Sequence, residues 1–170
     1  MKIRSINPQD WPQIMAIQHD CYQQITPEPL SVMQSKWHRS PQSCFVVEYK
    51  NQVIAYVLAH PWYQAKAPKL DMVLPSIKQA DCLYIHDMAV SPKAQGLGIA
   101  NKLVAEVKNA MTLLNFNGIG LIAIQGACAF WRKHQFSPLE SLPSVLTDSL
   151  ASYGADAHYL YFSEPANTPS

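Results

Sequence analysis

The segment 82–114 constrains this chain more than any other part of its sequence. It reads CLYIHDMAVSPKAQGLGIANKLVAEVKNAMTLL. An apolar run of strand-forming residues is followed by a short loop with two glycines, and then by apolar residues at helical spacing. The first backbone N–H groups of a helix lack partners and lie at the positive end of its dipole, so they bind anions. The segment therefore predicts an anion-binding loop between a strand and a helix.

The composition favours a single globular domain in a reducing compartment. The chain has 170 residues, of which 48% are hydrophobic and 15% are charged, and its net charge is +1. This charge gives no basic surface for nucleic acid, and no apolar run reaches the roughly 20 residues of a membrane helix. The N-terminus lacks the apolar core of a signal peptide. The four cysteines form no C-x-x-C pair, so we expect free thiols and a cytoplasmic protein.

The remaining patterns predict strands and helices on both sides of this segment. Asn7 and Pro8 are typical of a helix start, with Asn7 as the cap and Pro8 at the first helical position. Lys50-Asn51 joins two β-rich runs and predicts a hairpin turn. A proline-containing connection, 61–80, precedes the central strand, and is either a binding segment or a plain surface loop. The expected strands are 2–6, 43–49, 52–60, 118–124 and 157–162, and the other expected helices are 30–38, 127–134 and a short one within 142–153.

The glycine loop taken alone permits two interpretations. Glycine at 96 and 98 would let a phosphate approach the backbone and would tolerate positive φ. The same pattern also occurs in ordinary turns. It lacks the third glycine and the downstream acidic residue of a dinucleotide fingerprint, and it lacks the Gly-Lys-Ser/Thr of a P-loop.

The wider sequence resembles a known family. The string VSPKAQGLGIA (90–100) resembles the acetyl-CoA loop of the GNAT superfamily of N-acetyltransferases, and ACAFWRKHQF (127–136) resembles a later block of that family. The order of expected elements also fits. The resemblance implies one GNAT-like α/β domain over 1–163, with a mixed, mostly antiparallel sheet flanked by helices and a splayed central strand pair. Residues 164–170 are expected to form a flexible tail.

The resemblance also implies where acetyl-CoA binds. The backbone of the central strand would pair with the pantetheine arm, the glycine loop would surround the pyrophosphate, and two aromatic residues would lie beside the thioester. The implied cofactor-binding residues are Met88, Ala89, Val90, Gln95, Gly96, Leu97, Gly98, Ile99, Ala100, Phe130 and Trp131. Many family members protonate the leaving thiolate with a tyrosine at the position of Trp131, and indole cannot supply that proton. Core packing is the alternative role for Trp131.

Three residues of the central strand are candidates for acid–base chemistry. Strict alternation would place Tyr84, His86 and Met88 on one face, and Ile85, Asp87 and Ala89 on the other. His86 is the first candidate for the base, because arylalkylamine N-acetyltransferases resemble this strand with a catalytic histidine there, and because the usual imidazole pKa suits the task. The glutamate base of histone-type members would fall at Tyr84. Asp87 is charged on a strand expected to be buried, so it is either paired structurally or functional.

These observations predict an acetyl-CoA-dependent N-acetyltransferase. The acceptor would be a primary amine of a small, partly apolar molecule or of a chain terminus, attacking directly in a ternary complex. A homodimer is compatible with the sequence, and the histidine and cysteine spacing suits no metal site. Two alternatives remain: an acyl-CoA-binding sensor or scaffold without catalysis, and a nucleotide-binding α/β domain.

Overall fold

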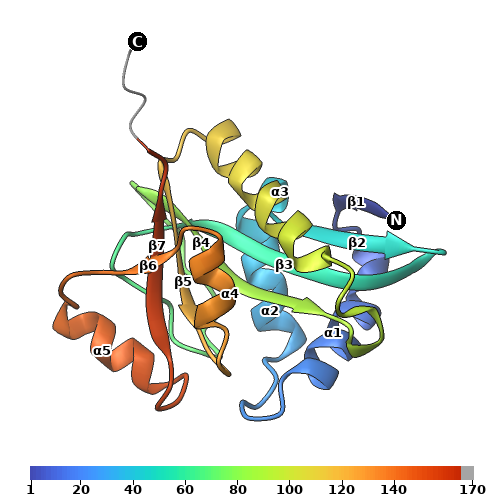
Figure 1. The fold of residues 1–170 in the computed structure, drawn as a ribbon, viewed down its shortest axis with the longest axis horizontal. Coiled ribbons are helices and arrows are strands. Elements are labelled where there is room, and N and C mark those ends of the chain that lie inside the picture. Colours follow the sequence, from blue (N-terminus) through green and yellow to red (C-terminus); the bar gives the residue numbers. More distant parts are fainter. Residues whose placement is uncertain (166–170) are drawn as a thin grey trace.

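The computed structural model describes residues 1–165, which form one seven-stranded sheet with helices on both faces (Figure 1). The strands lie in the order β1-β2-β3-β4-β5-β7-β6. β4 and β5 run parallel, and every other neighbouring pair is antiparallel. The predicted mixed, mostly antiparallel sheet is therefore confirmed. The strand bounds are β1 Lys2–Ser5, β2 Phe45–Tyr49, β3 Gln52–Trp62, β4 Cys82–Val90, β5 Gly118–Ala123, β6 Ser137–Pro138 and β7 His158–Ser163.

The helices divide between the two faces according to their apolar stripes. Leu103 of α3 and Trp131 of α4 pack with Val57 in one core. Ile14 of α1 and Met33 of α2 pack on the opposite face, and α5 covers that same face near the ends of β3 and β7. The helix bounds are α1 Trp11–Cys21, α2 Leu30–Arg39, α3 Ile99–Leu113, α4 Cys128–Lys133 and α5 Ser144–Ala151.

The N-terminal helix begins later than its sequence suggests. Asn7 and Pro8 start a short 3₁₀ turn, and α1 begins only at Trp11. The carboxylate of Asp10 accepts a hydrogen bond from the Asn7 N–H at 2.7 Å and pairs with Arg4. These contacts hold the turn and set the direction in which α1 leaves it. The β2–β3 hairpin behaves as predicted, since Lys50 and Asn51 both have positive φ, 49° and 62°.

β4 and β5 separate after a short parallel ladder. Their register joins Leu83 to Ile119 and Ile85 to Leu121, and no pair follows within residues 1–165. β4 nevertheless continues to Val90, paired only with β3. The predicted splay is present, and it leaves an open wedge between the two central strands.

A bulge at His86 changes which side chains share a face of β4. Leu58 of β3 is opposite Asp87, and Ala59 is opposite Ile85, so His86 is the extra residue. Ile85 and Met88 consequently contact the core beneath α3, whereas Asp87 bonds to side chains on the α1 face. The expected alternation, with Met88 beside His86 and Asp87 beside Ile85, is therefore wrong.

The connection between β3 and β4 and the C-terminal tail complete the described chain. Residues 63–81 have no helix or strand and lie across the face that carries α2 and α5. Glu164 donates its N–H to Asn117 O at 2.9 Å. Most of the tail expected to be flexible, 166–170, falls outside the described residues. No helix within 1–165 has the length and apolarity to cross a membrane.

Candidate active site

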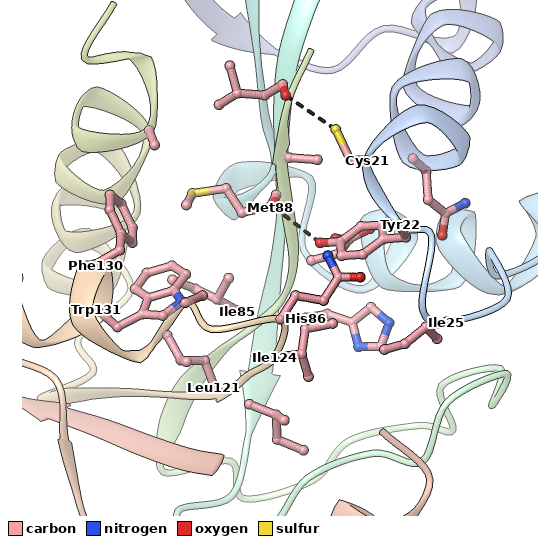
Figure 2. A pocket seen from close by; sticks show the side chains of 18 of the residues that line it. Cys21, Tyr22, Ile25, Ile85, His86, Met88, Leu121, Ile124, Phe130 and Trp131 are labelled. Carbon is pink, nitrogen blue, oxygen red and sulfur yellow. Dashed lines mark hydrogen bonds between the residues drawn. The ribbon is translucent and has the colours of Figure 1, made fainter. Parts of the chain in front are cut away.

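The wedge between β4 and β5 opens into a cavity of about 630 Å³. It is lined by the loop that precedes α3, by α4, by the end of α1 and by the α1–α2 loop. Figure 2 shows Phe130 and Trp131 on one side of this cavity, with Tyr22 and Ile25 on the other. One continuous space therefore joins the glycine loop to the acidic and imidazole groups of β4.

The glycine loop has the geometry of an anion cradle. Gly96 and Gly98 have φ of +80° and +72°, and a Cβ built on either would meet no atom within 4 Å. α3 begins at Ile99 without a side-chain cap, so its first N–H groups remain available to a ligand. The chain at this point fits a pyrophosphate group.

Lys133 adds a positive charge near that cradle. It lines the cavity from the end of α4, and the ring of the next residue, His134, lies 2.9 Å from Asn101 Oδ1 in the first turn of α3. Lys133 is the single lysine or arginine among the cavity-lining residues of the described chain. The positive charge of the cavity is therefore on the side of α3 and α4.

The predicted aromatic pair has two different environments. Trp131 is buried in the core, packs against Phe136 with ring centres 5.2 Å apart, and also lines the cavity. Phe130 is half-buried and lies edge-on to Trp131. The sequence left two roles open for Trp131, core packing and lining of the cofactor site. Trp131 has a place in both the core and the cavity wall.

The backbone of β4 already has partners from α1. The Tyr22 hydroxyl lies 3.2 Å from the carbonyl oxygen of Met88, and Cys21 Sγ donates to the carbonyl oxygen of Val90 at 3.2 Å. Both contacts are visible in Figure 2. A ligand pairing with these carbonyls would share or replace those contacts.

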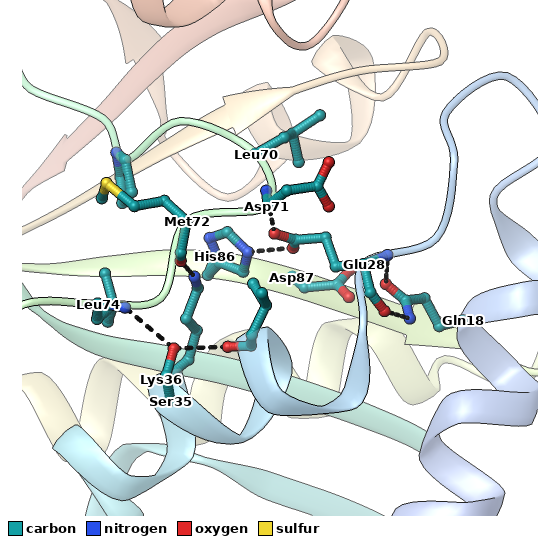
Figure 3. Close-up of polar contacts among 12 residues, drawn as sticks. Gln18, Glu28, Ser35, Lys36, Leu70, Asp71, Met72, Leu74, His86 and Asp87 are labelled. Carbon is teal, nitrogen blue, oxygen red and sulfur yellow. Dashed lines mark hydrogen bonds and ion pairs between the residues drawn. The ribbon is translucent and has the colours of Figure 1, made fainter.

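His86 is paired with an acid that the sequence analysis did not select. Its Nε2 lies 2.5 Å from Glu28 Oε1, and the side chains of His86 and Glu28 are 1% and 5% exposed (Figure 3). Burial alone would raise the pKa of Glu28, but the hydrogen bond and charge of His86 and the charge of Lys36 lower it. Glu28 is therefore ionised and accepts a hydrogen bond from His86, so the proton of the neutral imidazole is on Nε2. Nδ1 is then the nitrogen that can accept a second proton.

Asp87 lies on the same face as His86 and is held by two phenols. The Tyr22 hydroxyl donates to one carboxylate oxygen, and the Tyr56 hydroxyl donates to the other at 2.6 Å. Burial raises the pKa of Asp87, although both phenols and His86 oppose that shift. Asp87 lines the cavity with its carboxylate already engaged.

Three tyrosines on or near β4 could supply a proton to the leaving thiolate, and they lie in different environments. Tyr84 and Tyr159 are buried in a side cluster and do not line the cavity, whereas Tyr153 does. The Tyr153 hydroxyl donates to Pro68 O at 2.9 Å. Burial raises the pKa of all three phenols. Tyr84 is therefore not brought to the reaction space with His86 and Asp87.

The sequence profile of the acetyltransferase (GNAT) family matches residues 11–136. The chain belongs to this family. The match includes α1, the splayed strand pair, the glycine loop and α4. Comparison with curated protein sequences finds no significant match.

Solved GNAT structures share the fold at low sequence identity. Ard1 from Thermoplasma volcanium superposes with a TM-score of 0.71 at 15% identity, over 96% of this chain and 97% of that one. A GNAT family acetyltransferase from Brucella melitensis, solved in complex with acetyl-CoA, gives 0.62 at 15% identity, over 99% and 91%. The loading GNATL domain of CurA from Lyngbya majuscula gives 0.76 at 9% identity, over 95% and 96%. These likenesses establish the GNAT fold of this chain.

Sequence reasoning missed the groups that this GNAT domain gathers around His86. Glu28 also accepts the Asp71 N–H at 2.9 Å, which ties the α1–α2 loop to the β3–β4 connection. Lys36 of α2 is fully buried and donates to Met72 O (Figure 3). Glu28 lies 58 positions from His86, and no periodic pattern links residues so far apart. Lys36 stands among the apolar residues of its helix, and this position is the one feature of the sequence that could have indicated a buried charged cluster.

Replacing Lys36 with methionine is expected to change how stability depends on alkaline pH. Burial lowers the pKa of Lys36 from 10.5 to about 8, against the opposing charges of Glu28 and Asp71. Between these two values the unfolded chain binds more protons than the folded chain, so the free energy of unfolding rises with pH across that window. Lys36→Met lacks this rise. Denaturant unfolding of both proteins at three pH values should show the free energy of unfolding of the wild type rising relative to that of the variant. A difference between the two free energies that does not change with pH would contradict the lowered pKa of Lys36.

Proposed function

We propose that this protein transfers the acetyl group of acetyl-CoA to a primary amine of a small molecule. One observation carries the proposal: a single cavity joins an uncapped glycine loop to a buried carboxylate–imidazole pair. Membership of the GNAT family and the acetyl-CoA complex of the Brucella melitensis structure support the donor. The amine would attack the thioester directly in a ternary complex.

The donor would lie along the splay with its pyrophosphate at residues 95–100. Gly96 and Gly98 leave room for the phosphates, and the first N–H groups of α3 and the Lys133 ammonium supply positive charge. The thioester would lie beside Phe130 and Trp131, with its carbonyl oxygen near the backbone of Met88. A hydrogen bond there would stabilise the charge that develops on this oxygen.

His86 and Glu28 would act together on the amine proton. The amine nitrogen forms a bond to the carbonyl carbon, and the carbon–sulfur bond breaks with its electron pair going to sulfur. His86 takes the released proton at Nδ1 through an intervening water, because its side chain is only 1% exposed. The Glu28 carboxylate keeps Nε2 protonated and stabilises the imidazolium. Tyr153 directs its hydroxyl to Pro68 O, so we assign protonation of the thiolate to solvent.

The acceptor end of the cavity suits an amine without a neighbouring carboxylate. Apolar side chains of Ile25 and Leu70 line it together with the acids Glu28 and Asp87. Lys133, on the far side near α3, is the one lining lysine or arginine within residues 1–165. A substrate carboxylate placed beside the amine would meet two acids and no lining cation to pair with, because the nearby Lys36 does not reach the cavity surface. A cationic or neutral amine would not have this cost.

A matched substrate pair tests this acceptor class. 2-Phenylethylamine and phenylalanine differ by one carboxylate, and we expect kcat/KM to be at least about 100-fold higher for the amine, as for other buried unpaired charges. Thiol release from acetyl-CoA would be measured for both compounds. Equal rates would contradict the acceptor assignment. Tight acetyl-CoA binding without release for any amine would instead favour the sensor role.

Two broader expectations from the sequence remain predictions. A cytoplasmic location would be tested by cell fractionation. A homodimer would be tested by sedimentation of the purified protein over a range of concentrations.

A further inference from the structure

His60 presents a buried nitrogen without a partner beside the proposed base. The residue is 0% exposed, and its Nδ1 lies 2.9 Å from Pro61 O. A carbonyl oxygen only accepts, so Nδ1 carries the proton and Nε2 carries a bare lone pair. Burial, followed by the charge of His86, lowers the pKa of His60 to about 3, so the ring stays neutral at physiological pH. No group of residues 1–165 makes a hydrogen bond to Nε2.

Two neighbouring rings carry unpartnered nitrogens as well. His86 Nδ1 and Trp62 Nε1 are both buried, and neither has a hydrogen-bond partner in the described chain. The ring centre of His60 lies 5.6 Å from that of Trp62 and 6.2 Å from that of His86. His60 and Trp62 are two residues apart on β3, so their side chains point to the same face of the sheet.

The three nitrogens have the complementary chemistry of one water site. Buried polar groups are almost always hydrogen-bonded, and a buried water makes about three such bonds to groups that would otherwise be unpaired. Trp62 Nε1 can only donate, and His60 Nε2 can only accept. None of the three nitrogens bonds directly to another within residues 1–165, and the rings are close enough for one water to bridge them.

We propose that one buried water binds among His60 Nε2, Trp62 Nε1 and His86 Nδ1, and that His60 is thereby a positioning residue for the base. This role for His60 rests on the proposed function, in which this same water passes the amine proton to Nδ1, whereas the water site itself does not. With neutral His86, the water accepts from Trp62 and donates to both histidines. With protonated His86, it accepts from Trp62 and His86 and donates to His60. The water makes three hydrogen bonds in both states. It therefore needs only to reorient when His86 gains or loses its proton.

Other titratable groups also surround His86, and they bear on any test by pH. They are Glu28 in the α1–α2 loop, Lys36 on α2, His60 on β3, Asp71 in the β3–β4 connection, Tyr84 and Asp87 on β4, and Tyr153 after α5. His60 is the neighbour that can accept, through the water, a bond from protonated Nδ1. Changing His60 alone therefore isolates this contact.

Two measurements on the wild-type protein test the site directly. A crystal structure at a resolution that shows ordered water should have one within hydrogen-bond distance of His60 Nε2 and His86 Nδ1. ¹⁵N spectra of histidine-labelled protein should show His60 neutral, with its proton on Nδ1. An ordered site without that water, or a proton on His60 Nε2, would overturn the proposal. Neither measurement requires the enzyme to turn over.

A variant pair then tests the role of His60. The water's bond to His60 is stronger when the water accepts from the charged imidazolium of His86, so losing it destabilises protonated His86 more than neutral His86. His60→Leu should therefore move the acid limb of the kcat/KM profile down by up to about one pH unit, while the KM for acetyl-CoA stays the same. His60→Gln keeps an accepting oxygen and should restore the wild-type profile. Identical profiles for wild type and His60→Leu would refute the positioning role. If no amine supports turnover, which would refute the proposed function, the ¹⁵N titration of His86 in the same variants replaces the rate profile.

Discussion

Replacing Gly98 with glutamate is expected to weaken CoA binding by at least about 100-fold. The new carboxylate would occupy the position of the pyrophosphate at the N-terminus of α3, where it would repel the phosphates and compete for the same N–H groups. A Cβ at this position meets no protein atom within 4 Å, so the variant should fold. The positive φ of +72° adds a strain of roughly 1–2 kcal/mol. Isothermal titration with CoA measures the effect.

Gly98→Asn is the matched control for that experiment. Asparagine tolerates positive φ better than most residues and places a polar side chain without a charge at the same position. We expect this variant to lose much less affinity than Gly98→Glu while having similar thermal stability. Retained CoA binding in Gly98→Glu would remove the glycine loop from the donor site.

Replacing His86 with glutamine is expected to lower kcat by about 10²- to 10⁴-fold, the usual contribution of a general base. The glutamine amide can still donate to Glu28, so the buried carboxylate keeps a partner while the titrating imidazole is lost. CoA affinity should not change. The loss should be greatest at high pH, because a general base acts only in its unprotonated form. Steady-state rates across the pH range measure both features.

His19→Gln is the control for His86→Gln, because His19 is an exposed histidine on α1. We expect no change in rate from this substitution. A His86→Gln enzyme with the wild-type rate and pH profile would transfer the base role to Asp87 or to solvent.

The sequence predicted the parts of this protein that depend on local pattern. The run 82–114 contains a strand, a glycine loop and an amphipathic helix in succession, and the observed bounds of β4 and α3 follow that pattern closely. Ile14 and Ile17, which stand at helical spacing in the sequence, lie on the buried face of α1. These features are encoded by neighbours within one or two turns of chain, so reading the periodicity is sufficient.

The acid–base centre could not be predicted in this way, because it depends on contacts between distant segments. Strict alternation misplaced Asp87, since the bulge at His86 arises from the register between β3 and β4 and not from either sequence alone. Glu28 and Lys36 reach His86 from a loop and a helix that dock on the sheet only in the folded chain. The sequence predicts His60 only as the last residue of a hairpin strand, and its proximity to His86 likewise follows from the pairing of β3 with β4.

Amine-dependent thiol release from acetyl-CoA is the measurement that tests the central claim most directly. The purified protein would be incubated with acetyl-CoA and 2-phenylethylamine, and both free CoA and the acetylated product would be quantified by mass spectrometry. We predict equal amounts of CoA and N-acetyl amine, with neither formed by Gly98→Glu. CoA release that is independent of the amine, or binding of acetyl-CoA with no acetylated product from any amine tested, would contradict the account.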